Sequence, residues 1–246
     1  MNNILFSFLL TSIAGFSTLI GTIIIFIKNK NPNKIIVSSL SFAAAIMIFI
    51  SISDLIPESI KILRNYYNFY LTCLLCLLFI IIGIIISMLI DYKIPNHEKL
   101  YKVGIISMIA IIIHNIPEGI ATFIATTNDI NLGIDLTIAI ALHNIPEGIA
   151  ISIPIYYATK NKKKTFIYTL ISALSEPFGA LITYIFLKKY ITFKILGLLF
   201  AIIGGIMFQI SFCELLPKAK EYKLNKYNKA FFIIGCLFYI IYYIFL

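Results

Sequence analysis

Charged residues are scarce in this sequence. Only 13% of its 246 residues are Asp, Glu, Lys or Arg, whereas 60% are hydrophobic. Soluble domains carry roughly twice that share of charge, so the composition excludes an ordinary soluble domain and is typical of a membrane protein. Apolar runs of about twenty residues, enough to cross a hydrocarbon core of roughly 30 Å as a helix, recur along the whole chain.

Acidic residues are the scarcer charge, with 11 Asp and Glu against 20 Lys and Arg and a net charge of +9. Such a balance can indicate nucleic-acid binding, but these lysines lie in short clusters between apolar runs, as topology signals do. We therefore expect no nucleic-acid partner. The first apolar run has no basic residue before it and no small-residue cleavage site, which predicts a retained helix rather than a removed signal peptide.

Cysteine is also rare, with four residues in the chain. Cys73 and Cys76 have the CxxC spacing of redox or metal sites, but both lie within an apolar run. Buried, unreactive packing explains them better than chemistry does, and the same holds for Cys236.

The apolar runs predict an all-α polytopic membrane protein, forming a single transmembrane domain over residues 1–246. The eight expected helices cover approximately residues 4–27, 35–57, 69–90, 103–126, 132–157, 165–187, 193–216 and 230–246. The first, third, fifth and seventh connections hold fifteen Lys and Arg residues, and the others hold five. The positive-inside rule therefore predicts odd connections in the cytoplasm and both termini outside.

Two internal repeats organise these spans. Residues 47–57 (MIFISISDLIP) align with residues 207–217 (MFQISFCELLP), pairing Asp54 with Glu214 in the second and seventh spans. These spans run in opposite directions, so the chain contains an inverted repeat, a common transporter architecture. The sequence HNIPEGIA occurs at residues 114–121 and again at residues 143–150, in the fourth and fifth spans. The arrangement is three spans, a central pair and three spans.

The central motifs introduce polar groups where a membrane helix can least accommodate them. His114, His143 and Glu176 each lie about eleven residues into their spans, which is the depth of the bilayer midplane. Within each motif the His and Glu are four residues apart, on one helical face. The candidate metal ligands are His114, Glu118, His143 and Glu147 for a first site, with Asn115, Asn144 and Glu176 for a second site that shares the glutamates.

Some roles stay open at this point. Asn115 and Asn144 either bind metal or only hydrogen-bond to neighbouring helices. Asp54 is expected near the outer end of the second span, and Glu214 near the inner end of the seventh. They either attract and release cations there or are simply solvated carboxylates. Glu58 is expected at the surface. The absence of a thiolate from the ligand set argues against Cu(I).

The doubled HNIPEG motif, the sequence Ser175-Glu176-Pro177 in the sixth span and the eight-span topology resemble the ZIP (Zrt/Irt-like) metal transporters, most closely their bacterial ZupT-like branch. This resemblance covers essentially the whole chain. It implies uptake of divalent metal (zinc, with iron(II), manganese or cobalt as further cargo) into the cytoplasm through a site between the fourth and fifth helices. In such transporters the site is often binuclear, and the resemblance implies alternating access by movement of one helix bundle against another. Asp54 would serve the entrance and Glu214 the exit.

The sequence departs from the family pattern near the exit, where Cys213 precedes Glu214 in place of the common His and the third connection has only His97. An intramembrane zinc hydrolase is the main alternative, but the H-E-x-x-H pattern is absent, so no enzymatic activity is expected. The expected partners are divalent metal ions, carried as cargo with no prosthetic group, and the lipid bilayer of the cell membrane. A homodimer stays an open alternative.

Overall fold

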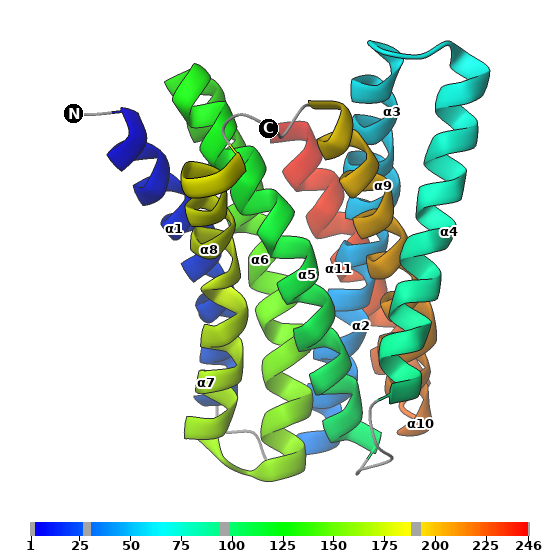
Figure 1. The fold of residues 1–246 in the computed structure, drawn as a ribbon. Helices are drawn as coiled ribbons and strands as arrows, with labels where there is room; N and C mark the ends of the chain where they lie inside the picture. Colours follow the sequence, from blue (N-terminus) through cyan, green and yellow to red (C-terminus); the bar gives the residue numbers. More distant parts are fainter. Residues whose placement is uncertain (1–2, 27–30, 94–98, 188–192, 246) are drawn as a thin grey trace.

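The computed structural model describes residues 3–26, 31–93, 99–187 and 193–245, and their regular secondary structure is helical (Figure 1). The helical segments form eight consecutive rods. They are α1 (Asn3–Thr22) with η1 (Ile23–Phe26); α2 (Pro32–Ile50), η2 (Ser51–Leu55) and α3 (Ile56–Arg64); α4 (Phe69–Lys93); α5 (Lys99–Asn128); α6 (Ile130–Thr159); α7 (Lys162–Ala173), α8 (Ser175–Ile182) and η3 (Thr183–Leu187); α9 (Phe193–Ile210), η4 (Ser211–Leu215) and α10 (Leu216–Glu221); and α11 (Asn225–Phe245).

Seven of these rods are long and apolar enough to cross a membrane, and α11 forms the eighth rod with 21 residues. The predicted all-helical, polytopic membrane architecture is therefore confirmed. The two central helices, α5 and α6, have 30 residues each, which corresponds to about 45 Å of helix. Both are long enough to reach through the headgroup regions of a bilayer.

Short polar caps set where several helices begin. The side chain of Asp129 accepts hydrogen bonds from the backbone N–H groups of Asn131 and Leu132 at the start of α6. Asn31 and Asn161 cap α2 and α7 in the same way, through the N–H groups of Lys34 and Lys164. Such caps satisfy N–H groups that a helix leaves unpaired, so a tight connection can turn the chain back into the membrane.

The rods form two bundles that lie side by side (Figure 1). One bundle contains α1, α5, α6 and the α7–α8 rod, and the other contains the α2–α3 rod, α4, the α9–α10 rod and α11. The bundles meet mainly where α2 packs on α6 and where α5 packs on α9. The helices that carry the two HNIPEGIA motifs thus belong to the same bundle and pack directly against each other.

The inverted repeat is visible as matching local geometry. The two aligned segments contain the π-helical turns η2 and η4, and in each turn the serine hydroxyl donates a hydrogen bond of 2.8 Å to the carbonyl four residues before it. Helices α2 and α9 run in opposite directions through the molecule (Figure 1). Because π-helical turns are rare and concentrate at functional sites, their presence in both copies supports the repeat and draws attention to Asp54 and Glu214, which lie within them.

The cysteines fit the packing interpretation. All four are free thiols; Cys76 is buried and Cys73 is partly buried. The sulfur of Cys76 lies 3.0 Å from the hydroxyl of Ser59, within a small core between α3 and α4.

Candidate metal site

The two HNIPEGIA motifs face each other near the middle of α5 and α6. His114 and Glu118 come from α5, His143 and Glu147 come from α6, and each His–Glu pair is separated by one helical turn. All four side chains are buried, and His143 is the most exposed of them at 8%. The antiparallel arrangement brings the two pairs together from opposite sides of one space.

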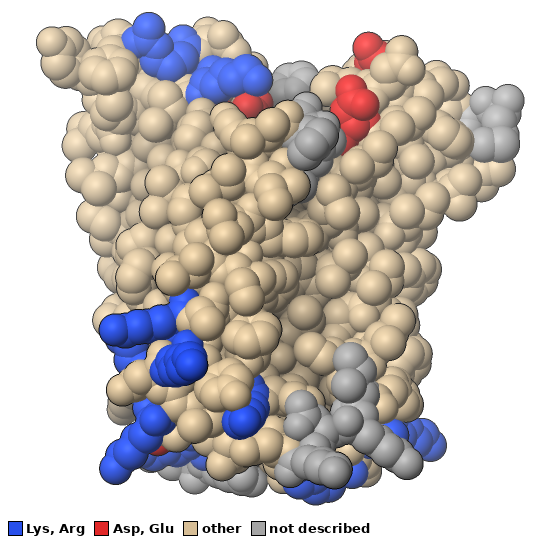
Figure 2. Space-filling model, turned by 180° about the vertical axis from the view of Figure 1, so that it is seen from behind, with Lys and Arg blue, Asp and Glu red and all other residues tan. Residues whose placement is uncertain are grey.

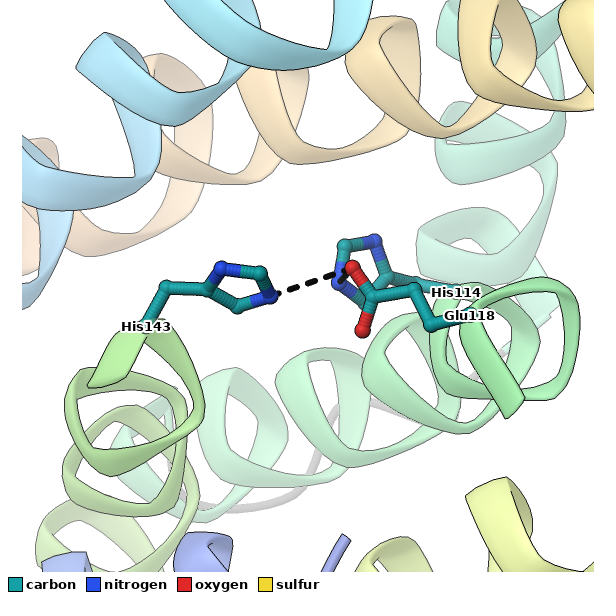
Figure 3. Close-up of side chains that lie close together, drawn as sticks. All are labelled: His114, Glu118 and His143. Atoms are coloured by element: carbon teal, nitrogen blue, oxygen red, sulfur yellow. Dashed lines mark hydrogen bonds and ion pairs between the residues drawn. The ribbon is translucent and has the colours of Figure 1, made fainter. Parts of the chain in front are cut away.

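The distances between these groups are those of a metal-binding cluster. The Nε2 atom of His114 lies 3.0 Å from Oε1 of Glu118 and 3.1 Å from Oε1 of Glu147, and Nε2 of His143 lies 3.1 Å from Oε1 of Glu118. Figure 3 shows His114, Glu118 and His143 pointing toward one another across the gap between the two helices. One ligand atom from each of these three residues fits within 4.8 Å of the others, close enough to share one ion.

Several polar atoms in this cluster lack a partner. Among the described residues, Oε2 of Glu118, Oε2 of Glu147 and Nδ1 of His114 are buried without a hydrogen bond. Burying a carboxylate oxygen without compensation is costly, particularly at membrane depth. A bound cation would provide that compensation, and two imidazoles with two carboxylates are a suitable donor set for a divalent transition metal.

The predicted second set of ligands lies beside the first, but its members differ in their surroundings. Glu176, in the first turn of α8, is fully buried and accepts a hydrogen bond from the Nδ2 group of Asn144, which also donates to the Ala14 carbonyl at 3.0 Å. This bonding ties α6 to α1 and α8 and leaves Oδ1 of Asn144 without a partner. Neither side-chain atom of Asn115 has a hydrogen-bond partner among the described residues. Asn144 can therefore hold the helices together and still offer its oxygen to a cation.

The proline and glycine of each motif shape the backbone around the site. Pro117 and Pro146 lie inside α5 and α6 and lack the N–H that would bond to the carbonyl one turn earlier. Gly119 packs directly on the backbone of Glu176, and Gly148 packs on the backbone of Thr18 in α1. These glycines let the helices approach closely, and at Gly119 the contact lies against the backbone that carries Glu176.

A cavity of about 510 Å³ leads from this cluster toward the turn between α5 and α6. Glu118 and His143 line its inner part, and Asn128 lines its part near the turn. Asp54 and Glu58 also line the cavity. Glu58 lies at the surface as expected, with its side chain 44% exposed and its carboxylate 3.1 Å from the ammonium group of Lys61, but it also lines this cavity. It lies four residues after Asp54, and that spacing places both carboxylates on one helical face, a signal that was available in the sequence.

Tyr239 of α11 is a further residue that the sequence did not single out. Its hydroxyl donates a hydrogen bond of 2.7 Å to Oδ1 of Asp54, and its ring lines a small cavity together with His143. Tyr239 is 3% exposed. It therefore orients the Asp54 carboxylate at the point where the larger cavity approaches the metal cluster.

Glu214 lies apart from the cluster, at the other end of the molecule. It interacts electrostatically with Asp91 of α4 and with Lys102 of α5. Lys102 lies twelve residues before His114, so about 18 Å of helix separates these two residues. Lys102 and Asp91 form an ion pair of 2.7 Å. Between this end and the cluster, one apolar core contains Val103, Ile106 and Ala110 of α5 together with residues of α9 and η4.

Comparison with known proteins shows which family this chain resembles. Residues 93–242 match the protein family described as ZIP zinc transporter. The chain is 41% identical to the zinc transporter ZupT of Campylobacter jejuni, in an alignment that covers 89% of each protein. It is 42% identical to the zinc transporter ZupT of Streptococcus mutans, with 88% of each covered, and 37% identical to that of Clostridium perfringens, with 90% of this chain and 89% of the relative covered.

Proposed function

This chain belongs to the ZIP zinc transporter family, and from that membership we propose that it carries zinc across the cell membrane into the cytoplasm through the cluster between α5 and α6. The whole chain acts as one transporter domain with both termini outside. Membership in a transporter family also favours transport over the alternative of an intramembrane hydrolase.

The observation that carries the proposal is the buried His114–Glu118–His143 cluster at the inner part of a cavity. A permanently closed structural metal site would not need an open route, whereas a transport site does. Imidazole and carboxylate donors suit Zn²⁺ and also suit Fe²⁺, Mn²⁺ and Co²⁺, so several metals are carried, with zinc among them. Asn115, Asn144 and Glu176 contribute to a second ion position that shares the two glutamates.

We infer that this arrangement represents the outward-facing state of an alternating-access cycle. The cavity lies on the side of the α5–α6 turn, which the charge distribution assigns to the outside, whereas apolar packing fills the opposite half. Asp54 and Glu58 serve the entrance and Glu214 serves the exit. Movement of the bundle that contains α1, α5, α6 and the α7–α8 rod against the other bundle would then open the inner half.

Uptake into liposomes tests this function directly. Purified protein in vesicles should accumulate Zn²⁺, and separate assays with Fe²⁺, Mn²⁺ and Co²⁺, with and without an imposed pH gradient, should rank the metals and identify a coupling ion. Vesicles containing the protein that take up none of these metals faster than empty vesicles would overturn the proposal.

Neutralising the entrance acids should weaken cation capture. We expect Asp54→Asn and Glu58→Gln each to raise the zinc concentration for half-maximal uptake by up to about tenfold, with little change in the maximal rate, because these carboxylates concentrate cations in the cavity. The effect should shrink at high ionic strength. Asp135→Asn is the matched control, because Asp135 is exposed near the same end of α6 but does not line the cavity. An equal effect in the control would contradict the assignment.

The ion pair between Lys102 and Asp91 joins the two bundles at the inner end, at 2.7 Å, beside Glu214. We expect Lys102→Gln to loosen this end and to increase amide hydrogen exchange in the first turns of α5 by up to about fivefold. Lys99→Gln is the control, because its pair with Glu221 is longer, at 3.8 Å, and more exposed. Unchanged exchange in Lys102→Gln would show that the pair does not hold this end closed.

A further inference from the structure

A second cavity, separate from the metal route, forms a groove between the two bundles. It has a volume of about 440 Å³, within the range of roughly 300–1,000 Å³ that ligand sites occupy. Residues of α2 and α11 line it from one bundle, and residues of η1 and α6 line it from the other. None of its lining residues belongs to the metal cluster or to the entrance.

The groove spans the depth of one leaflet. Along α2 its lining extends from Lys34, three residues after the helix cap, to Phe42, a distance of about 12 Å. Half of a hydrocarbon core is about 15 Å thick. Ile234, another lining residue, is 45% exposed, so the groove reaches the lateral surface that faces lipid.

The polarity of the lining changes along this depth. Lys34 lies at the end near the helix cap, with its ammonium group 4.8 Å from the centre of the Tyr227 ring, and Ser38 and Ser39 follow one turn later. The deeper part is formed by the apolar side chains of Phe42, Ile149, Phe231 and Ile234. Among the residues that the structure describes, no acidic side chain lines the groove.

Basic residues also surround this end of the molecule. Figure 2 shows Lys and Arg side chains gathered at the lower end, which is the end where α2 begins. The fifteen-to-five distribution of basic residues assigns this end to the cytoplasm, and anionic lipids of the facing leaflet are attracted to such a surface.

We propose that an anionic phospholipid of the inner leaflet occupies this groove. Its phosphate lies against Lys34 and the two serine hydroxyls, and one acyl chain runs along Phe42, Ile149 and Phe231. A single cationic end on a groove one leaflet deep matches a phospholipid better than a peptide, which would need partners for its backbone groups along the apolar part. Because both bundles form the walls, the lipid bridges the surfaces that separate when the bundles move.

Lipid binding to the purified full chain tests this inference without any metal. Native mass spectrometry of the detergent-solubilised protein, titrated with phosphatidylglycerol or phosphatidylcholine, should show one tightly retained phosphatidylglycerol. Lys34→Gln should reduce its preference over phosphatidylcholine by about fivefold, the effect of one basic residue near an anionic lipid. Ser38→Phe, which fills the groove, should remove the retained lipid.

Lys93→Gln is the matched control, because Lys93 is an exposed lysine at the inner end of α4 that does not line the groove. If Lys34→Gln and Lys93→Gln lower the preference for phosphatidylglycerol equally, general surface charge explains the binding and the proposal is overturned. Unchanged retention in Ser38→Phe would place the lipid elsewhere and also overturn it. If Ser38→Phe fails to fold, the comparison between the two lysine variants decides the question.

Discussion

Zinc uptake should fall to the level of protein-free vesicles when Glu118 and Glu147 are both changed to Gln. These carboxylates are buried, and each lies within 3.1 Å of an imidazole of the cluster. Gln keeps their size but removes both negative charges that would stabilise a desolvated dication. We expect a loss of at least about 100-fold, because each 1.4 kcal/mol of lost binding energy corresponds to a factor of ten.

The control for this double variant is Glu221→Gln, which removes one carboxylate that is exposed at the end of the α9–α10 rod and pairs with Lys218. It should transport zinc like the wild type. Thermal unfolding of each purified variant would separate loss of the site from loss of the fold. A well-folded double variant with normal uptake would show that the cluster between α5 and α6 is not the route.

Changing Glu176 to Gln should remove one of two bound metals. Glu176 is fully buried and accepts a hydrogen bond from Asn144, whose own oxygen lacks a partner among the described residues. We expect calorimetric titration to show two zinc ions per wild-type chain and one per Glu176→Gln chain. Uptake should fall about 10- to 100-fold, the usual cost of disturbing a metal ligand or its support.

Thr183→Val provides the control in the same rod, because the Thr183 hydroxyl bonds locally to the Gly179 carbonyl and is also buried. It should keep both metals. A Glu176→Gln protein that still binds two zinc ions would show that Glu176 only supports Asn144, and a wild type that binds a single ion would remove the second position altogether.

Much of the fold could be predicted from the sequence because the membrane imposes strong local rules. A helix must be about twenty apolar residues long to cross, so hydrophobic runs alone predicted the helical segments and the all-helical class. The doubled HNIPEGIA motif predicted which residues share a depth, because His114 and His143 occupy equivalent positions in consecutive antiparallel helices. The identity of the two sequences also predicted that both helices would contribute the same ligand types.

The details of the site depended on tertiary contacts. Tyr239 reaches Asp54 across 185 positions of sequence, and no local pattern connects a tyrosine in the last helix with an acid in the second. The two roles of Asn144 depend on the Ala14 carbonyl and on Glu176, which lie on two other helices. The cavity that includes Glu58 exists because α3, α5, α6 and α9 leave space between them.

The sequence by itself determined the helices, and it predicted their orientation and the depth of the polar groups, because hydrophobicity, charge and helical period act over neighbouring residues. Only the tertiary structure decided which end of the site is accessible. The cavity near the α5–α6 turn and the packed opposite half depend on how the two bundles pack against each other, and residues far apart in the chain set that geometry. A motif fixes the chemistry of a site, but helix packing fixes the side from which an ion can reach it.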